Sequence, residues 1–170
     1  MNFPEIFKEL LAYLKNPQKK INELPDWDWQ TLGAVHLLLA VSSGVAEGIV
    51  ARKFYQIIGG IIFTPILYTF TLLVFGLGLY YVILYYFGKE VSVRRLLTVL
   101  VMANIPFLIF QILTPLFSLI TLAGFFFSSM ILIVGLVNNF SLPRKEVAYL
   151  IFGFYTLAFV FEIWGKIKVG

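Results

Sequence analysis

The sequence predicts an all-α polytopic membrane protein: a bundle of five transmembrane helices preceded by an amphipathic interfacial helix. The first observation is the stretch Leu96–Pro143, whose 48 residues include no Asp, Glu, Lys, Arg or His. One straight helix of that length would measure roughly 70 Å, about twice the thickness of a bilayer's hydrocarbon core. The stretch must therefore fold back on itself within lipid. The second observation is composition: 60% of the residues are hydrophobic and 13% are charged, about half the charged share usual in soluble domains.

Residues 1–30 are expected to form an amphipathic helix and a polar cytoplasmic connection. Apolar side chains recur at helical spacing along one face of residues 1–15, and Asn16-Pro17 is expected to end this helix. Such a helix can lie in the headgroup region of a membrane. It can equally pack against the protein's own cytoplasmic loops, since both arrangements use the same apolar stripe.

Residues 31–170 are expected to form the transmembrane domain. A helix needs about 20 apolar residues to cross a bilayer. The hydrophobic runs place the five spans at about 31–50, 61–87, 95–113, 116–137 and 146–164.

Two features of these runs concern breaks between helices. The run that ends at residue 87 is longer than one crossing needs. It is therefore expected to tilt, to project from the membrane, or to begin with a short separate piece before Pro65. Thr114-Pro115 predicts a very tight connection between the third and fourth spans, because proline cannot continue the hydrogen-bonding pattern of a helix.

Small residues four positions apart predict surfaces where helices approach closely. These pairs are Gly44 with Gly48 and Gly124 with Ser128. The same residues suit contacts within the chain and contacts between copies of it. A homo-oligomer or a membrane-protein partner is therefore expected beside the lipid bilayer itself.

Five polar side chains inside the predicted spans are candidates for a polar path between helices. A transporter, channel or permease subunit would use such side chains: His36, Ser43, Glu47, Asn104 and Gln111. The alternative is structural. His36 and Glu47 lie near opposite interfaces of the first span, and Asn104 is close enough to Pro106 to satisfy a carbonyl that the proline frees.

The basic residues indicate topology. With a cytoplasmic N-terminus, the inside segments hold nine Lys and Arg residues and the outside segments hold four. The positive-inside rule therefore favours an N-terminus in the cytoplasm and a C-terminus outside. Eight of the nine are also candidates for contact with anionic headgroups or a protein partner: Lys8, Lys15, Lys19, Lys20, Arg94, Arg95, Arg144 and Lys145. We attribute the net charge of +4 to topology and to contact with anionic headgroups, and no nucleic-acid partner is expected.

The sequence offers little for catalysis. It contains no cysteine and one histidine, and its pattern shows no paired carboxylates, no Gly-rich phosphate loop and no metal-ligand cluster. No catalytic residue, cofactor or metal site is expected, and we predict a protein that is not an enzyme.

Several short motifs carry a resemblance to a known family. They are Phe7-Lys8-Glu9-Leu10-Leu11, Phe87-Gly88-Lys89 with Val93-Arg94-Arg95, Ala103-Asn104-Ile105-Pro106, and Leu142-Pro143-Arg144-Lys145-Glu146. In their order and spacing the sequence resembles the Yip (Ypt-interacting protein) family in its short bacterial or archaeal form, over nearly the whole chain.

The resemblance implies a cytoplasmic N-terminus in a prokaryotic cytoplasmic membrane. It also implies a scaffold or adaptor that organises membrane or partner proteins through its cytoplasmic face. Eukaryotic relatives carry an Asp-Leu-Tyr-Gly-Pro-type motif before the first span, where this chain has Asp26-Trp27-Asp28-Trp29-Gln30. The eukaryotic role of binding Rab-type GTPases is therefore not carried over.

Overall fold

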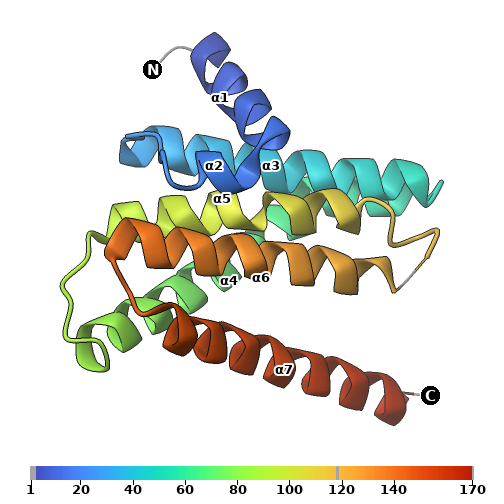
Figure 1. Ribbon diagram of the computed structural model, residues 1–170. Coiled ribbons are helices and arrows are strands. Elements are labelled where there is room, and N and C mark those ends of the chain that lie inside the picture. Colours follow the sequence, from blue (N-terminus) through green and yellow to red (C-terminus); the bar gives the residue numbers. More distant parts are fainter. Residues whose placement is uncertain (1–2, 118, 170) are drawn as a thin grey trace.

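The computed structural model confirms the all-α class (Figure 1). It describes the backbone of residues 3–117 and 119–169, and the side chains of residues 4–117, 119–156 and 160. Every regular element in these described ranges is a helix. The elements are α1 (Phe3–Lys15), α2 (Pro17–Lys20), α3 (Trp29–Val50), α4 (Phe54–Tyr85), α5 (Val93–Gln111), α6 (Ile120–Phe140) and α7 (Arg144–Val169).

Short polar side chains set several helix ends. The Asp28 carboxylate accepts a hydrogen bond of 2.7 Å from the backbone N–H of Thr31, which satisfies a free donor at the start of α3. Hydrogen bonds from Thr31 also hold the pKa of Asp28 below its usual value. The Ser92 hydroxyl accepts from the Arg95 N–H at the start of α5. At the end of α6, Ser141 adopts the left-handed conformation (φ 51°) that commonly stops a helix.

Four helices, α3, α4, α5 and α6, are long and apolar enough to cross a membrane. The fifth predicted span, 146–164, falls within α7. Side chains 157–159 and 161–169 of α7 lie outside the described residues, so the fifth crossing stays a prediction.

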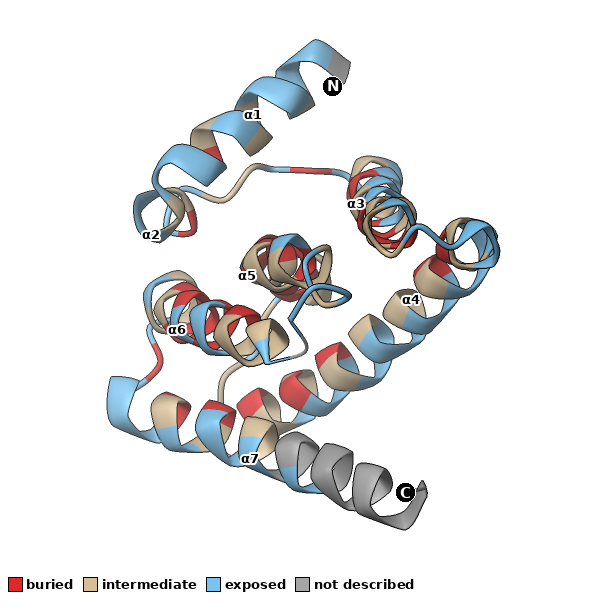
Figure 2. Ribbon diagram, turned by 90° about the vertical axis from the view of Figure 1, so that its right-hand side faces the viewer, coloured by how far each residue is buried: buried red, intermediate tan, exposed pale blue. Residues whose placement is uncertain are grey.

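Two features bear on the expected breaks between helices. Helix α4 is continuous through Pro65, so of the three expected alternatives the separate piece before that proline is not formed. At 32 residues it measures about 48 Å, and it runs obliquely to α3, α5 and α6 (Figures 1 and 2). The connection between α5 and α6 is also longer than expected, because α5 ends at Gln111 and α6 begins only at Ile120. In the described part of this segment, turns lie on both sides of Pro115, which has no N–H to extend either helix.

Helix α5 is the centre of the bundle. Figure 2 shows it among α2, α3, α4 and α6, and every side chain from Leu96 to Ala103 is buried. Helices α3, α5 and α7 begin at one end of the bundle, where α4 and α6 end (Figure 1). We call this the basic end, because five basic residues lie on those termini and the α4–α5 connection: Lys89, Arg94, Arg95, Arg144 and Lys145.

Candidate functional site

Helices α1 and α2 are fixed to the bundle by three large buried side chains. Tyr13, Ile21 and Trp27 are each at most 1% exposed. The indole N–H of Trp27 donates a 2.9 Å hydrogen bond to the Glu9 carboxylate on α1. Ile21 enters the gap between α5 and α6, so close to Gly135 that a β-carbon there would lie 2.8 Å from it. The N-terminal segment is therefore part of the folded core.

Polar contacts reinforce this attachment. Asn139 on α6 donates to the carbonyl oxygen of Ile21 at 2.8 Å, and Asn138 donates to the Asn22 side chain at the same distance. Arg94 on α5 forms an ion pair of 2.8 Å with Asp26. In the sequence the two asparagines directly follow the predicted span 116–137. That position is the only available signal, and it does not identify their partners.

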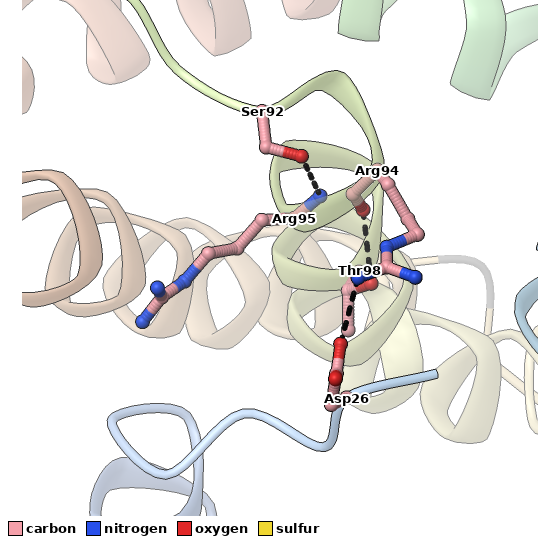
Figure 3. A network of polar contacts seen from close by, with 5 residues as sticks. All are labelled: Asp26, Ser92, Arg94, Arg95 and Thr98. Carbon is pink, nitrogen blue, oxygen red and sulfur yellow. Dashed lines mark hydrogen bonds and ion pairs between the residues drawn. The ribbon is translucent and has the colours of Figure 1, made fainter. Parts of the chain in front are cut away.

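The two neighbouring arginines of α5 have different neighbours (Figure 3). The Arg94 side chain reaches Asp26, and the Arg94 carbonyl accepts a hydrogen bond from the Thr98 hydroxyl at 2.9 Å. The Arg95 side chain extends away from Asp26 in this view and donates to the Asn139 side chain at 3.2 Å. Lys89 likewise donates to the carbonyl oxygens of Phe140 and Ser141 and so caps the end of α6.

The eight basic candidates therefore fall into two groups. Lys20, Arg94 and Arg95 contact Glu23, Asp26 and Asn139 respectively. The hydrogen bond and charge of Lys20 hold the pKa of Glu23 below its usual value. The other five are exposed: Lys8, Lys15, Lys19, Arg144 and Lys145.

Helix α1 has two apolar faces. Ile6, Leu10 and Tyr13 pack into the core, and burial raises the pKa of the Tyr13 hydroxyl. Phe7, Leu11 and Leu14 are 55%, 43% and 49% exposed. We call these last three residues the outer stripe. One face of α1 thus packs against the protein itself, in line with one of the two arrangements expected from the sequence. The described part of the chain leaves the outer stripe exposed.

Four of the five polar-path candidates take part in contacts between helices. The His36 Nε2 atom on α3 lies 3.1 Å from the Thr69 hydroxyl on α4. The Ser43 hydroxyl donates to the Leu108 carbonyl on α5 at 3.0 Å. The Gln111 amide on α5 donates to the Glu47 carboxylate at 2.9 Å. It also accepts from the hydroxyl of Tyr68 on α4, a residue that the sequence did not single out.

Asn104, the fifth candidate, lies apart from these contacts and lines a cavity bounded by α4, α5, α6 and α7. A polar group of α6 lies next to Pro106. The Ser128 hydroxyl accepts a hydrogen bond of 3.0 Å from the Phe107 N–H. Gly124, one turn earlier on α6, lies directly against Phe107 and Phe110. The predicted Gly124/Ser128 surface is therefore a contact between α5 and α6.

A bundle built largely of apolar helices, four of them able to cross a bilayer, defines an integral membrane protein. The family model described as the Yip1 domain matches residues 11–165, and the chain belongs to the Yip family. Neither a curated protein nor a solved structure matches the chain. Among the described residues, no group of three or more His, Cys, Asp or Glu side chains is placed to hold a metal ion.

Proposed function

We propose that this Yip-family protein is a non-enzymatic membrane scaffold that acts through its basic end. In this proposal α1 lies in the headgroup region of the cytoplasmic leaflet, with its outer stripe in contact with lipid. The exposed basic residues hold anionic headgroups, and the basic end presents a fixed surface to a partner protein.

The observation that carries the proposal is the outer stripe of α1. Phe7, Leu11 and Leu14 are exposed although α1 is attached to the bundle through its opposite face. An apolar stripe on a fixed helix needs an apolar neighbour outside the chain. Figures 1 and 2 show α1 lying across the direction of α3, α5 and α6, which is the orientation of a helix in the membrane plane.

Charge supports the orientation that we propose. Five exposed basic residues lie on α1, on α2 and at the start of α7. Each basic residue close to an anionic surface contributes about 1 kcal/mol of attraction. Two of the five, Arg144 and Lys145, lie at the basic end. That end would therefore face the cytosol, most simply in a prokaryotic cytoplasmic membrane, and the C-terminus would lie outside.

The position of the outer stripe can be measured with a single label. The chain has no cysteine, so Leu11→Cys creates one unique site for an environment-sensitive fluorophore. In nanodiscs with anionic lipid, lipids carrying a spin label on an upper acyl-chain carbon should quench a fluorophore at position 11. They should quench one at Lys8→Cys, another exposed position of α1, much less, because the Lys8 side chain would reach outward to the headgroups. Equal quenching at both positions, or none at position 11, would contradict an interfacial α1.

The scaffold role requires a separate experiment in native membranes. Replacing Arg144 and Lys145, the exposed basic residues at the start of α7, by Gln should abolish crosslinks between the basic end and its protein partner while the bundle stays folded. The matched control is Arg52→Gln with Lys53→Gln, because these residues are also exposed and basic but lie at the opposite end of the bundle. The same crosslinks in both variants would rule out the basic end as a working surface.

A transporter, channel or permease subunit is the second candidate function. The observation that favours it is the connection from Tyr68 through Gln111 to Glu47, which joins α4, α5 and α3 with polar groups. Ion or solute flux into proteoliposomes should then fall in Glu47→Gln and His36→Ala. Flux that persists in both variants would eliminate these residues as a path.

A further inference from the structure

A cavity of about 440 Å³ lies between α4, α5, α6 and α7. Figure 2 shows its setting, with α4 and α7 running beneath α5 and α6. The volume is within the range of sites that bind small molecules, about 300–1,000 Å³. Six aromatic side chains line it: Tyr68, Phe75, Phe107, Phe125, Phe154 and Tyr155.

Ring contacts between helices hold the walls of this cavity in place. The rings of Phe107 on α5 and Phe125 on α6 are 4.3 Å apart between centroids. Phe125 meets Tyr155 on α7 edge to face at 5.5 Å, and Phe75 on α4 meets Phe154 on α7 at 5.6 Å. Such geometries are favourable for aromatic pairs. The cavity is therefore bordered by flat, apolar aromatic rings that are already packed against one another.

One amide faces this apolar space. Asn104 lines the cavity and follows the first residue of α5 by eleven positions, which places it about 17 Å along the helix axis. That depth is near the middle of a hydrocarbon core of about 30 Å. A polar group at this depth without a partner is costly. Asn104 is thus placed to pair with a polar atom of a molecule that enters from the bilayer.

The lining also restricts the charge of such a molecule. Asp, Glu, Lys, Arg and His are all missing from the described residues that line the cavity. An ion would enter this space without a compensating charge, which is strongly unfavourable at membrane depth. Thr71, an exposed residue that also lines the cavity, marks an opening toward the surroundings of α4.

We propose that this cavity binds a neutral, membrane-soluble molecule with a planar apolar ring and a carbonyl group. The ring would lie against the aromatic walls, and the carbonyl oxygen would accept a hydrogen bond from the Asn104 amide. This chemistry is that of a quinone headgroup. An acyl chain fits it less well, because it would leave the amide unpaired. The inference is independent of the function proposed for α1.

The test compares two probes that differ only in the carbonyl groups. Menadione (2-methyl-1,4-naphthoquinone) and 2-methylnaphthalene share the fused ring system. Equilibrium dialysis against nanodiscs holding the intact protein, corrected with empty nanodiscs, would measure the binding of each. We expect one saturable site for menadione and binding of 2-methylnaphthalene that is weaker by about fivefold to tenfold, the contribution of one hydrogen bond.

Two variants assign this difference to the cavity. Asn104→Leu keeps the side-chain size but removes the amide, so it should make the two probes bind equally. Thr71→Trp should block the opening and abolish saturable binding of both probes. Leu73→Trp is the control for added bulk, because Leu73 is an exposed residue of α4 outside the cavity lining. It should bind menadione as the natural chain does.

Three results would overturn the proposal. The first is no saturable binding of menadione by the natural chain. The second is equal binding of the two probes by the natural chain, which would mean that the cavity accepts any hydrocarbon, acyl chains included. The third is an undiminished preference for menadione in folded Asn104→Leu, because the carbonyl would then be recognised elsewhere.

Discussion

Helix α4 meets its neighbours in two different ways. Near its start it touches α3 backbone to backbone: a β-carbon at Gly60 would lie 2.3 Å from the Gly44 carbonyl carbon, and one at Gly48 would lie 2.6 Å from the Ile57 nitrogen. Further along, between Tyr68 and Phe75, the same helix borders the cavity that separates it from α5, α6 and α7.

The side chains at the two places account for the difference. Lipid tails are as apolar as the helices, so apolar area alone does not bring transmembrane helices together, and close packing decides which of them touch. Glycines let two backbones approach until no space remains. Rings that pack on one another, such as Phe75 with Phe154, instead meet as a rigid rim with space beside it. How closely two helices of this bundle approach is therefore decided locally, by the size of the side chains at the facing positions.

The strongest way to break the closed contact is Gly60→Ala. The new methyl group would collide with the α3 backbone, which cannot move as a flexible side chain can. We expect the free energy of unfolding in mild detergent to fall by about 3 kcal/mol, the upper part of the range for overpacking. Gly59→Ala is the matched control, since its nearest neighbour would be a Phe63 side-chain atom at 3.9 Å. Similar stability of the two variants would show that the α3–α4 contact is not tight.

The second comparison uses one substitution at two buried alanines. Ala103 lines the cavity, whereas Ala40 on α3 is 1% exposed and lies outside the cavity lining. Ala103→Leu should raise the free energy of unfolding by about 1 kcal/mol, because it fills empty space. Ala40→Leu should lower it by about 2 kcal/mol through overpacking. Thermal unfolding in the same detergent would measure both. Losses of similar size in both variants would argue that the space beside Ala103 is too small to accept side-chain atoms.

The sequence was sufficient to predict a close glycine contact between helices, but not the cavity. The spacing of Gly44 and Gly48 predicted a close helix contact, and the structure supplies the partner positions on α4. Gly60 belongs to a glycine pair shortly before Pro65, where a separate helical piece is one of the expected alternatives, and such a pair suits a kink as well as it suits packing. The cavity involves rings from four helices, and no local pattern shows that they share one space.

The sequence also could not rank the helices by burial. In the most apolar window of each, 11% of α4 is buried inside the protein against 56% of α5. Both runs are apolar because lipid tails and the protein interior are both apolar surroundings and favour the same side chains. The helical spacing in residues 1–15 was recognised, but not that α1 has a second apolar face. Only the positions of Tyr13 and Trp27 in the fold separate the two faces.

The smallest expected effect concerns the polar contact beside the cavity. Tyr68 lines the cavity and donates its hydroxyl to Gln111, which also contacts Glu47. Tyr68→Phe keeps the ring but removes this hydrogen bond, and we expect a loss of about 0.6 kcal/mol in the free energy of unfolding, the average for one hydrogen bond between membrane helices. Tyr81→Phe is the control, because Tyr81 on the same helix is 53% exposed and should tolerate the change.

The size of the Tyr68 effect would show what holds α4 to α5 where glycines do not. A loss of about 0.6 kcal/mol would mean that one polar contact partly substitutes for close packing at the edge of the cavity. A change no larger than that of Tyr81→Phe would mean that the aromatic rim alone fixes the distance, as in the edge-to-face contact of Tyr68 with Phe107 at 6.3 Å. In that case the polar groups of α3, α4 and α5 would be free to serve the second candidate function, and Glu47→Gln would be the next variant to measure.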